Sequence, residues 1–277
     1  MSPDSTSQDF PVDSRHSPSS DLIRAVRART PARIFTGRAG PGYLTETQLE
    51  LRQDHAAAVD AVHAELDIDH DFGSDFVRRW KLFGVSTCAR SRTEFLVRPD
   101  LGRRLDQQAQ ELIARNCAVD PDLQVIIGDG LSALAVRIQV PPLVPLLADR
   151  AKQLGWSFGQ PFVVRNCRVG ILNAVGALLR PRAAVLLIGE RPGLNTAESL
   201  SAYMAYVPRI GHTDAERNLI SNIHSQGVSV GDAAQRIVAL AQKMMQMRVS
   251  GVLVKEDLIA KASLSPPSRP SLEEPAR

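Results

Sequence analysis

Three runs of apolar residues beyond residue 120 contain almost no polar positions. They cover residues 123–127, 162–164 and 185–188. Strands buried on both faces show this continuous pattern, whereas strands with one solvent face alternate apolar and polar residues. Residues 141–154 and 171–179, between the runs, have the length and apolar content of helices. Alternating strands and helices form right-handed βαβ units, so we predict an α/β fold with a parallel sheet flanked by helices.

The first half of the chain has mainly helical spacing of its apolar residues. A short helix is expected from Asp21, and residues 45–66 predict a longer one that opens with a Thr-x-x-Gln capping box. Residues 85–89 and 94–97 are short strand candidates, and the apolar residues of 105–113 recur with helical spacing. A helical N-terminal region with short strands is therefore predicted ahead of the sheet.

Beyond the third apolar run the pattern is helical again. Helix-compatible sequence follows from about residue 196. Another helix is predicted to begin at residue 213, because the apolar residues that follow would form one face of it. The residues of that face are Leu219, Ile220 and Ile223. A final helix runs to Met247, with Ser229 or Asp232 as its cap.

These patterns divide the chain into four parts. Residues 1–20 and 263–277 are rich in Ser and Pro and hold too few apolar residues to pack, so we predict disordered tails. Residues 21–118 form the helical N-terminal region. Residues 119–262 form the sheet domain.

Composition narrows the classes of function. The 277 residues carry a formal net charge of +3, which is too slight to indicate a nucleic-acid partner. No apolar run approaches the roughly 18 residues of a membrane span, and the N-terminus lacks the apolar segment of a secretion signal. Three cysteines lie far apart without a CxxC pair, which favours reduced, structural thiols in the cytoplasm, with a catalytic thiol as the alternative.

The turn Gly-Glu-Arg-Pro-Gly at residues 189–193 directly follows the third apolar run. Ligands of open parallel sheets bind where such strands end, and glycines let the backbone turn close to a ligand. Glu190 and Arg191 place both charges there. A surface ion pair in an ordinary loop is the alternative interpretation.

Residues 128–133, Gly-Asp-Gly-Leu-Ser-Ala, are a second candidate site between a strand and a helix. G-x-G-x-x-A in this setting is the fingerprint of a dinucleotide-binding loop, so a stand-alone nicotinamide dinucleotide-binding oxidoreductase is an alternative function. The fingerprint also expects a second strand that ends in an acidic residue about 20 residues later. Residues 140–149 instead contain three prolines and indicate a loop entering a helix.

Five separated motifs, spread over the N-terminal region and the sheet domain, together resemble one family. They are ARIFTGRAGP (32–41), RPDLGRRL (98–105), IIGDGLS (126–132), GERPGL with ESLS (189–194 and 198–201) and ISNIH (220–224). Their order and content resemble the small (light) subunit of ethanolamine ammonia-lyase, over about residues 20–255.

This resemblance implies the small subunit of a heteromeric carbon–nitrogen lyase that uses adenosylcobalamin to convert ethanolamine to acetaldehyde and ammonia. In that family the large subunit, a (β/α)₈ barrel, holds the substrate and the adenosyl side of the cofactor. The small subunit has a Rossmann-like fold and closes over the side where dimethylbenzimidazole stays on cobalt. Residues 119–262 would thus contact cobalamin, within a large hetero-oligomer. The glycine-rich loop at 36–42 and the turn at 98–104 are candidates for docking the large subunit.

The cofactor-binding positions of the family match Val169, Glu190 and Leu219. The resemblance implies a contact through the backbone amide of Val169 and one through the carboxylate of Glu190. Some members have Cys at the position of Leu219, so a contact by its side chain or by its backbone stays open. No catalytic or metal-ligating residue of this chain is implied.

Two further features bear on the cofactor and on location. Residues 222–227 differ by one residue from D-x-H-x-x-G, in which a histidine replaces the base of cobalamin, but the predicted helical setting argues against His224 as a cobalt ligand. Some members carry an amphipathic N-terminal segment linked with bacterial microcompartments. Residues 1–20 lack that periodicity, so the cytoplasm is expected, with encapsulation open.

Overall fold

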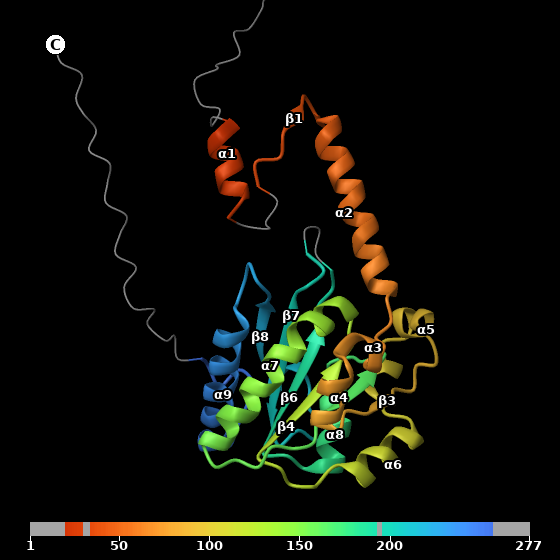
Figure 1. The fold of residues 1–277 in the computed structure, drawn as a ribbon, viewed down its shortest axis with the longest axis vertical. Helices are drawn as coiled ribbons and strands as arrows, with labels where there is room; N and C mark the ends of the chain where they lie inside the picture. Colours follow the sequence, from red (N-terminus) through yellow and green to blue (C-terminus); the bar gives the residue numbers. More distant parts are fainter. Residues whose placement is uncertain (1–19, 30–33, 193–195, 257–277) are drawn as a thin grey trace, which may run out of the picture.

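The chain folds into an open six-stranded sheet with helices on both faces (Figure 1). The computed structural model describes residues 20–29, 34–192 and 196–256. The predicted tails at 1–20 and 263–277 lie outside these described residues, except for Ser20, which begins α1. The strands are β1 (Arg38–Ala39), β2 (Gly42–Tyr43), β3 (Gly84–Ser86), β4 (Leu123–Gly128), β5 (Phe162–Arg165), β6 (Ala183–Gly189), β7 (Leu200–Tyr206) and β8 (Asn218–Ile223). The helices are α1 (Ser20–Arg27), α2 (Thr45–His63), α3 (Ile68–Phe72), α4 (Ser74–Trp80), α5 (Arg92–Val97), α6 (Gln107–Asn116), α7 (Ala133–Gln153), α8 (Ile171–Leu179) and α9 (Val230–Met247).

The three continuous apolar runs form the parallel centre of the sheet, as predicted. The strand order is β3-β5-β4-β6-β7-β8. β4 pairs in parallel with β5 and β6, and its register with β6 runs from Leu123 opposite Ala183 to Gly128 opposite Ile188. Every residue of β4 and β6 is buried. Because β3 is also parallel to β5, the carboxyl ends of these four strands lie along one edge of the sheet.

Successive residues of the central strands enter two separate cores. Val125 and Ile127 pack with α7, α9, α3 and α4, whereas Ile126 packs on the opposite face with α6 and α8. This follows from the period of two in a strand, which sends neighbouring side chains to opposite faces. In Figure 1, α7 and α9 lie in front of the sheet. The predicted helix at 171–179 is confirmed as α8, and Ser229 caps α9 through a bond from the Asp232 N–H.

The prediction of helical sequence after residue 196 is wrong, and the predicted parallel sheet is extended at one edge by two antiparallel strands. Residues 200–206 form β7, which pairs antiparallel with β6 from Leu200 opposite Gly189 to Tyr206 opposite Ala183. Its Leu, Ala and Met residues have high intrinsic helix propensity. That preference is overridden because the segment fills the hydrogen-bonding edge of β6 and buries most of its side chains.

The prediction of a helix with an apolar face from residue 213 is also wrong. Residues 218–223 form β8, antiparallel to β7. Ile220 and Ile223 are both buried although they lie three residues apart. A register shift between β7 and β8 near Leu200 permits this spacing, because an irregularity in the ladder breaks the strict alternation of faces. The same spacing is typical of a helix, which explains the error.

Two further expectations are corrected at helices. Residues 94–97 are not a strand but part of α5, where the Ser91 side chain caps the helix by accepting the Glu94 N–H and Phe95 is fully buried. Residues 140–149 are not a loop, because α7 begins at Ala133 and continues through its three prolines. Prolines remove backbone donors, yet most of the helix face is buried between the sheet and α9, which holds it together.

An arm, composed of residues 20–29 and 34–63, stands above the carboxyl edge of the sheet (Figure 1). The Arg27 guanidinium joins α1 to the following segment by donating to the Ile34 and Phe35 carbonyls at 3.1 and 2.9 Å. The glycine-rich segment at 36–42 contains β1 and the turn that leads into β2, which pairs antiparallel with β1. The capping box predicted for α2 does not form, since Leu44 occupies the N-cap position.

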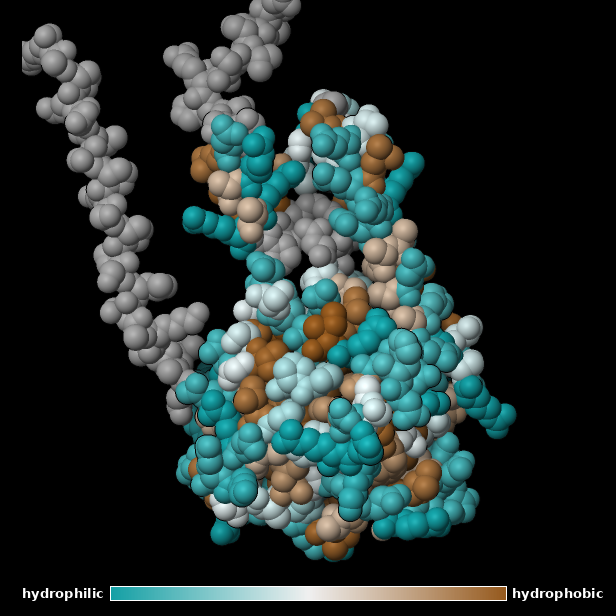
Figure 2. Space-filling model, viewed as in Figure 1, coloured by the Kyte–Doolittle hydropathy of each residue, from teal (hydrophilic) through white to brown (hydrophobic). Residues whose placement is uncertain are grey.

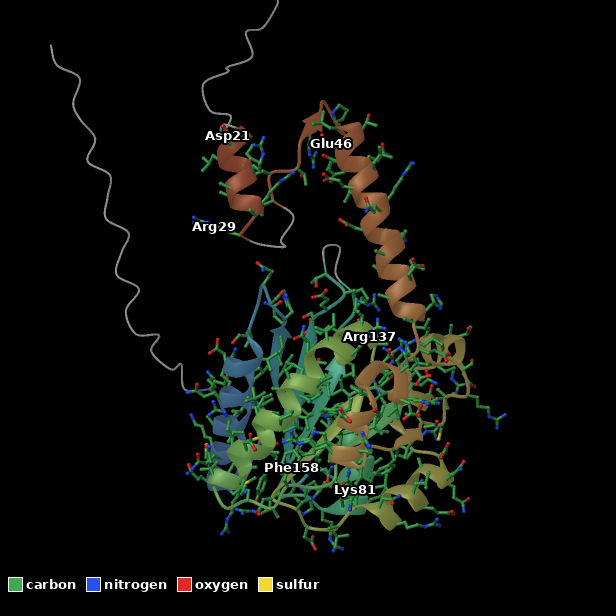
Figure 3. The ribbon with its side chains drawn as sticks, viewed as in Figure 1. Asp21, Arg29, Glu46, Lys81, Arg137 and Phe158 are labelled. Atoms are coloured by element: carbon green, nitrogen blue, oxygen red, sulfur yellow. The ribbon has the colours of Figure 1, made fainter. Side chains whose placement is uncertain are left out.

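The arm exposes much of its surface. Leu49 of α2 is 58% exposed, and Figure 2 shows hydrophobic and hydrophilic residues side by side on the arm. Asp21 and Glu46 lie on the arm, whereas Lys81 and Phe158 lie in the lower part of the body (Figure 3). In the described part of the chain, no helix is long and apolar enough to cross a membrane.

Candidate functional site

A pocket of about 370 Å³ lies at the carboxyl edge, between the turns after β4, β5 and β6 and the exposed face of β7 and β8. All three residues implied by the resemblance line it: Val169, Glu190 and Leu219. They come from three separate segments, 50 residues apart from first to last, and only the sheet brings them together. The pocket therefore coincides with the predicted end of the central strands.

Glu190 is held in place by three hydrogen bonds to its carboxylate. The Ser199 and Ser201 hydroxyls donate to it at 2.7 and 2.5 Å, and the Asn222 N–H donates at 3.0 Å. A carboxylate has about four acceptor positions, so one remains for a further donor. These bonds make the Glu190 carboxylate a fixed polar group and not half of an isolated surface ion pair with Arg191.

Sequence reasoning missed the polar residues that β7 and β8 contribute. Ser201 and Tyr203 line the pocket from β7, and Ser221 lines it from β8. The signal that could have found them is the period-two spacing of Ser199, Ser201 and Tyr203, which places side chains on one face of a strand. Burial, together with the carboxylates of Glu190 and Asp214, raises the pKa of the Tyr203 phenol.

Val169 lies in the turn between β5 and α8. Asn166 begins this turn with a left-handed φ of 53°. The Arg168 N–H donates to the Gly102 carbonyl at 2.8 Å, which ties the turn to the RPDLGRR segment. The Val169 N–H donates to no acceptor among the described residues. A backbone donor at a pocket wall is thus available to a ligand.

Leu219 lies on the edge strand β8, opposite Tyr203 of β7. Its side chain is 44% exposed and lines the pocket. Leucine offers only apolar contact at this position. The opposite wall carries Arg168, whose guanidinium lies 4.1 Å from the Phe95 ring centroid; burial and the neighbouring arginines lower its pKa.

The structure explains the residues at 128–133 without a dinucleotide. Gly130 has φ of +56°, and a Cβ there would lie 2.3 Å from the Gly189 carbonyl oxygen, so the turn after β4 packs directly on β6. Ser132 caps α7 by accepting the Ala135 N–H at 3.2 Å. The next strand, β5, ends in Arg165 and not in an acidic residue. The glycine spacing thus serves packing between strands.

His224 follows a strand, so the helical setting predicted for it is wrong. It is 3% exposed. The Gln226 N–H donates to its Nδ1 at 3.3 Å, which leaves the proton on Nε2 to donate to the Asn222 side-chain oxygen at 2.7 Å. Both ring nitrogens are engaged within the chain, and this is the physical reason against a cobalt-ligating role.

The cysteines are free thiols, as predicted. Burial raises the pKa of Cys117 to about 12 and raises that of Cys167 as well. A protonated, buried thiol is a poor nucleophile. These two residues therefore pack the core.

The fold and the pocket define a class: an α/β subunit whose ligand site opens at the carboxyl edge of its sheet. The chain belongs to the ethanolamine ammonia-lyase light chain (EutC) family, whose model matches residues 20–255. The ethanolamine ammonia-lyase small subunit of Clostridium perfringens is 39% identical over 230 residues, which are 83% of this chain and 76% of that protein. That of Rhodopseudomonas palustris is 40% identical over 246 residues, 89% and 94% of the two chains. The chain is thus the small subunit of a heteromeric lyase and has a large-subunit partner.

Proposed function

We propose that this chain binds adenosylcobalamin at the pocket of Val169, Glu190 and Leu219, on the side of the cofactor that carries dimethylbenzimidazole. Together with the large subunit it converts ethanolamine to acetaldehyde and ammonia. Bound adenosylcobalamin supplies radical chemistry through homolysis of its cobalt–carbon bond. The large subunit contributes the substrate site, and this chain contributes binding and orientation.

One observation carries the proposal. A free backbone donor at Val169 and a spare acceptor position on Glu190 line the same pocket, beside the apolar side chain of Leu219. A corrin with amide arms presents both donors and acceptors around an apolar ring, and such ligands are held by a few polar groups in a mainly apolar site. The residues present therefore fit the cofactor.

The size of the pocket supports a shared site. A volume of about 370 Å³ lies at the low end of the range for small-molecule pockets, whereas a complete cobalamin with its nucleotide tail is far larger. The pocket thus takes one part of the cofactor, and the large subunit encloses the rest. Because both ring nitrogens of His224 are engaged within the chain, this residue would not replace the base of the cofactor.

The proposal is tested by purifying the chain with its large subunit and titrating adenosylcobalamin into the complex. We expect a stable complex, saturable binding of the cofactor and ammonia release that depends on both subunits. Complex formation without cobalamin binding would contradict the assigned pocket. Binding of a nicotinamide dinucleotide by the isolated chain would instead support the oxidoreductase alternative.

A further inference from the structure

We infer that Asp129 is a positioning residue, whose buried carboxylate holds the turn that presents the Val169 N–H to the cofactor. This inference rests on the proposed function. Asp129 directly follows β4 in the Gly-Asp-Gly turn, and its side chain is 6% exposed. It does not line the pocket of Val169, Glu190 and Leu219, so it would act on the cofactor only through the turn after β5.

The carboxylate of Asp129 accepts two consecutive backbone donors. The Asn166 N–H donates to one oxygen at 2.8 Å, and the Cys167 N–H donates to the other at 2.9 Å. Consecutive N–H groups beside a left-handed residue form a concave anion-binding nest, and Asn166 has φ of 53°. The carboxylate of one strand end thus fixes the backbone of the next, two residues before Val169.

Arg92 completes the arrangement. Its guanidinium lies 3.4 Å from the Asp129 carboxylate, and its side chain is also 6% exposed. Arg92 donates to the Val62 carbonyl of α2 at 2.7 Å and lies over the Phe95 ring at 4.7 Å. Arg168, of the Val169 turn, lies over the same ring at 4.1 Å.

The backbone just before Val169 is therefore held from the core. Without the carboxylate, two buried N–H groups lose their acceptor and Arg92 loses its nearest counter-charge. Buried groups that lose a partner reorganise at considerable cost, so the turn would shift and carry the Val169 N–H with it. Cofactor binding would weaken, while the chemistry of bound cofactor would not change.

The test compares Asp129→Asn with wild type in the complex with the large subunit. Asparagine keeps the volume but can accept only one of the two N–H donors through its carbonyl oxygen. We expect the Kd for adenosylcobalamin to rise about tenfold or more. We expect kcat at saturating cofactor to stay within about twofold of wild type, because no group that touches the cofactor is altered.

Asp122→Asn is the matched control. Asp122 precedes β4 at the opposite edge of the sheet, accepts the Ser157 N–H at 2.9 Å and pairs with Arg182 at 2.7 Å. Loss of the Asp122 carboxylate removes a backbone N–H contact and an arginine ion pair, as at Asp129, but far from the pocket. We expect it to lower the melting temperature and to leave the Kd for cobalamin unchanged.

A second variant guards against a failure to fold. Asp129→Asn alone leaves a buried, uncompensated arginine, whereas Asp129→Asn combined with Arg92→Gln removes both charges, which buried pairs tolerate better. The double variant is expected to assemble and still bind cobalamin weakly. Unchanged cobalamin affinity in either variant, or equal weakening by Asp122→Asn, overturns the inference. Absence of cobalamin binding by the wild-type complex would instead refute the proposed function.

Discussion

Glu190 receives three hydrogen bonds from its own chain, and this determines how it can serve a ligand. Ser199, Ser201 and the Asn222 N–H orient both oxygens, so the remaining acceptor position points in a fixed direction. A group held in this way needs little ordering when a ligand binds, which favours affinity. Ser199 and Ser201 therefore set the orientation of the Glu190 carboxylate.

We predict that Glu190→Ala weakens adenosylcobalamin binding by the complex by about 1–3 kcal/mol, the range for loss of a buried polar anchor. The subunit should stay folded, because the carboxylate is at the pocket wall and not in the apolar core. Asp120→Ala, which removes an exposed ion pair with Arg180, is the control and should have no effect on binding. Equal affinities of wild type and Glu190→Ala in a cofactor titration would exclude the contact.

At this scale the sequence supplied Val169 and Leu219 only through resemblance to a family, whereas Glu190 also stood out in the turn at a predicted strand end. The turn at 189–193 was recognisable as a strand end, and Gly193 lies outside the described residues. Val169 and Leu219 have no local chemistry that marks them. A free N–H and an apolar side chain become a site only when other elements surround them, and residue types do not encode that.

Among the elements, α3 and α7 are joined by a polar contact that depends on pH. Asp71 of α3 accepts the Asp67 N–H at 2.9 Å and pairs with Arg137 of α7 at 3.1 Å; Arg137 is labelled in Figure 3. Burial acts to raise the pKa of Asp71, but the Asp67 N–H, the His70 ring and Arg137 together bring that pKa below 3.8. The folded carboxyl therefore holds its proton less tightly than the unfolded one.

The sign of the pH effect follows from this difference. A lowered folded pKa stabilises the fold at pH values above the unfolded pKa, and that stabilisation is lost as the pH falls through the folded pKa. We predict that Asp71→Asn lowers the free energy of unfolding by about 1 kcal/mol at pH 7. The difference from wild type should shrink below about pH 4.

Urea unfolding at pH 7 and pH 3 measures this difference. Asp75→Asn is a suitable control, because the Asp75 side chain is 94% exposed and its ion pair with Arg78 lies within α4. It should change stability little at either pH. A deficit of Asp71→Asn that is the same at both pH values would contradict the assigned contacts.

Elements with long, uniform patterns were predictable, and those that depend on a neighbour were not. β4, β5, β6, α8 and α9 follow from continuous apolar runs or from helical spacing with a cap. β7 and β8 consist of residues that also suit helices. They are strands because β7 pairs with the edge of β6 that β4 does not occupy, and β8 pairs with β7. Strand pairing is a tertiary interaction, so propensity in the segment alone cannot predict it.

In the molecule as a whole, the arm and the pocket both lie at the carboxyl edge of the sheet (Figure 1). α2 ends at residue 63, where the Val62 carbonyl accepts a bond from Arg92, and Arg92 reaches the Asp129 carboxylate. The base of the arm is thus connected to the turn that precedes Val169. The sequence before α1 differs from that of the arm in composition: it is rich in Ser and Pro and has few apolar residues with which to pack.

We predict that deletion of residues 1–18 leaves lyase activity of the assembled enzyme within about twofold of the full-length complex, since this sequence has few apolar residues with which to form stabilising contacts. The measurement is ethanolamine turnover by purified complexes at saturating adenosylcobalamin. Size-exclusion chromatography of both complexes controls for assembly. A large loss of activity with intact assembly would assign a catalytic contribution to this segment.

The sequence by itself determined the α/β class, the central parallel strands, the absence of a disulfide framework and, through its motifs, the family. These properties are encoded in apolar runs, in the periodicity of apolar residues and in the spacing of motif residues, all within short segments of the sequence. Only the tertiary structure decided that the sheet is mixed, that Ser201, Tyr203 and Ser221 join the pocket, and that Asp129 supports the turn of Val169. Those depend on which strand edges and strand ends meet, and contacts between residues distant in sequence leave no local pattern.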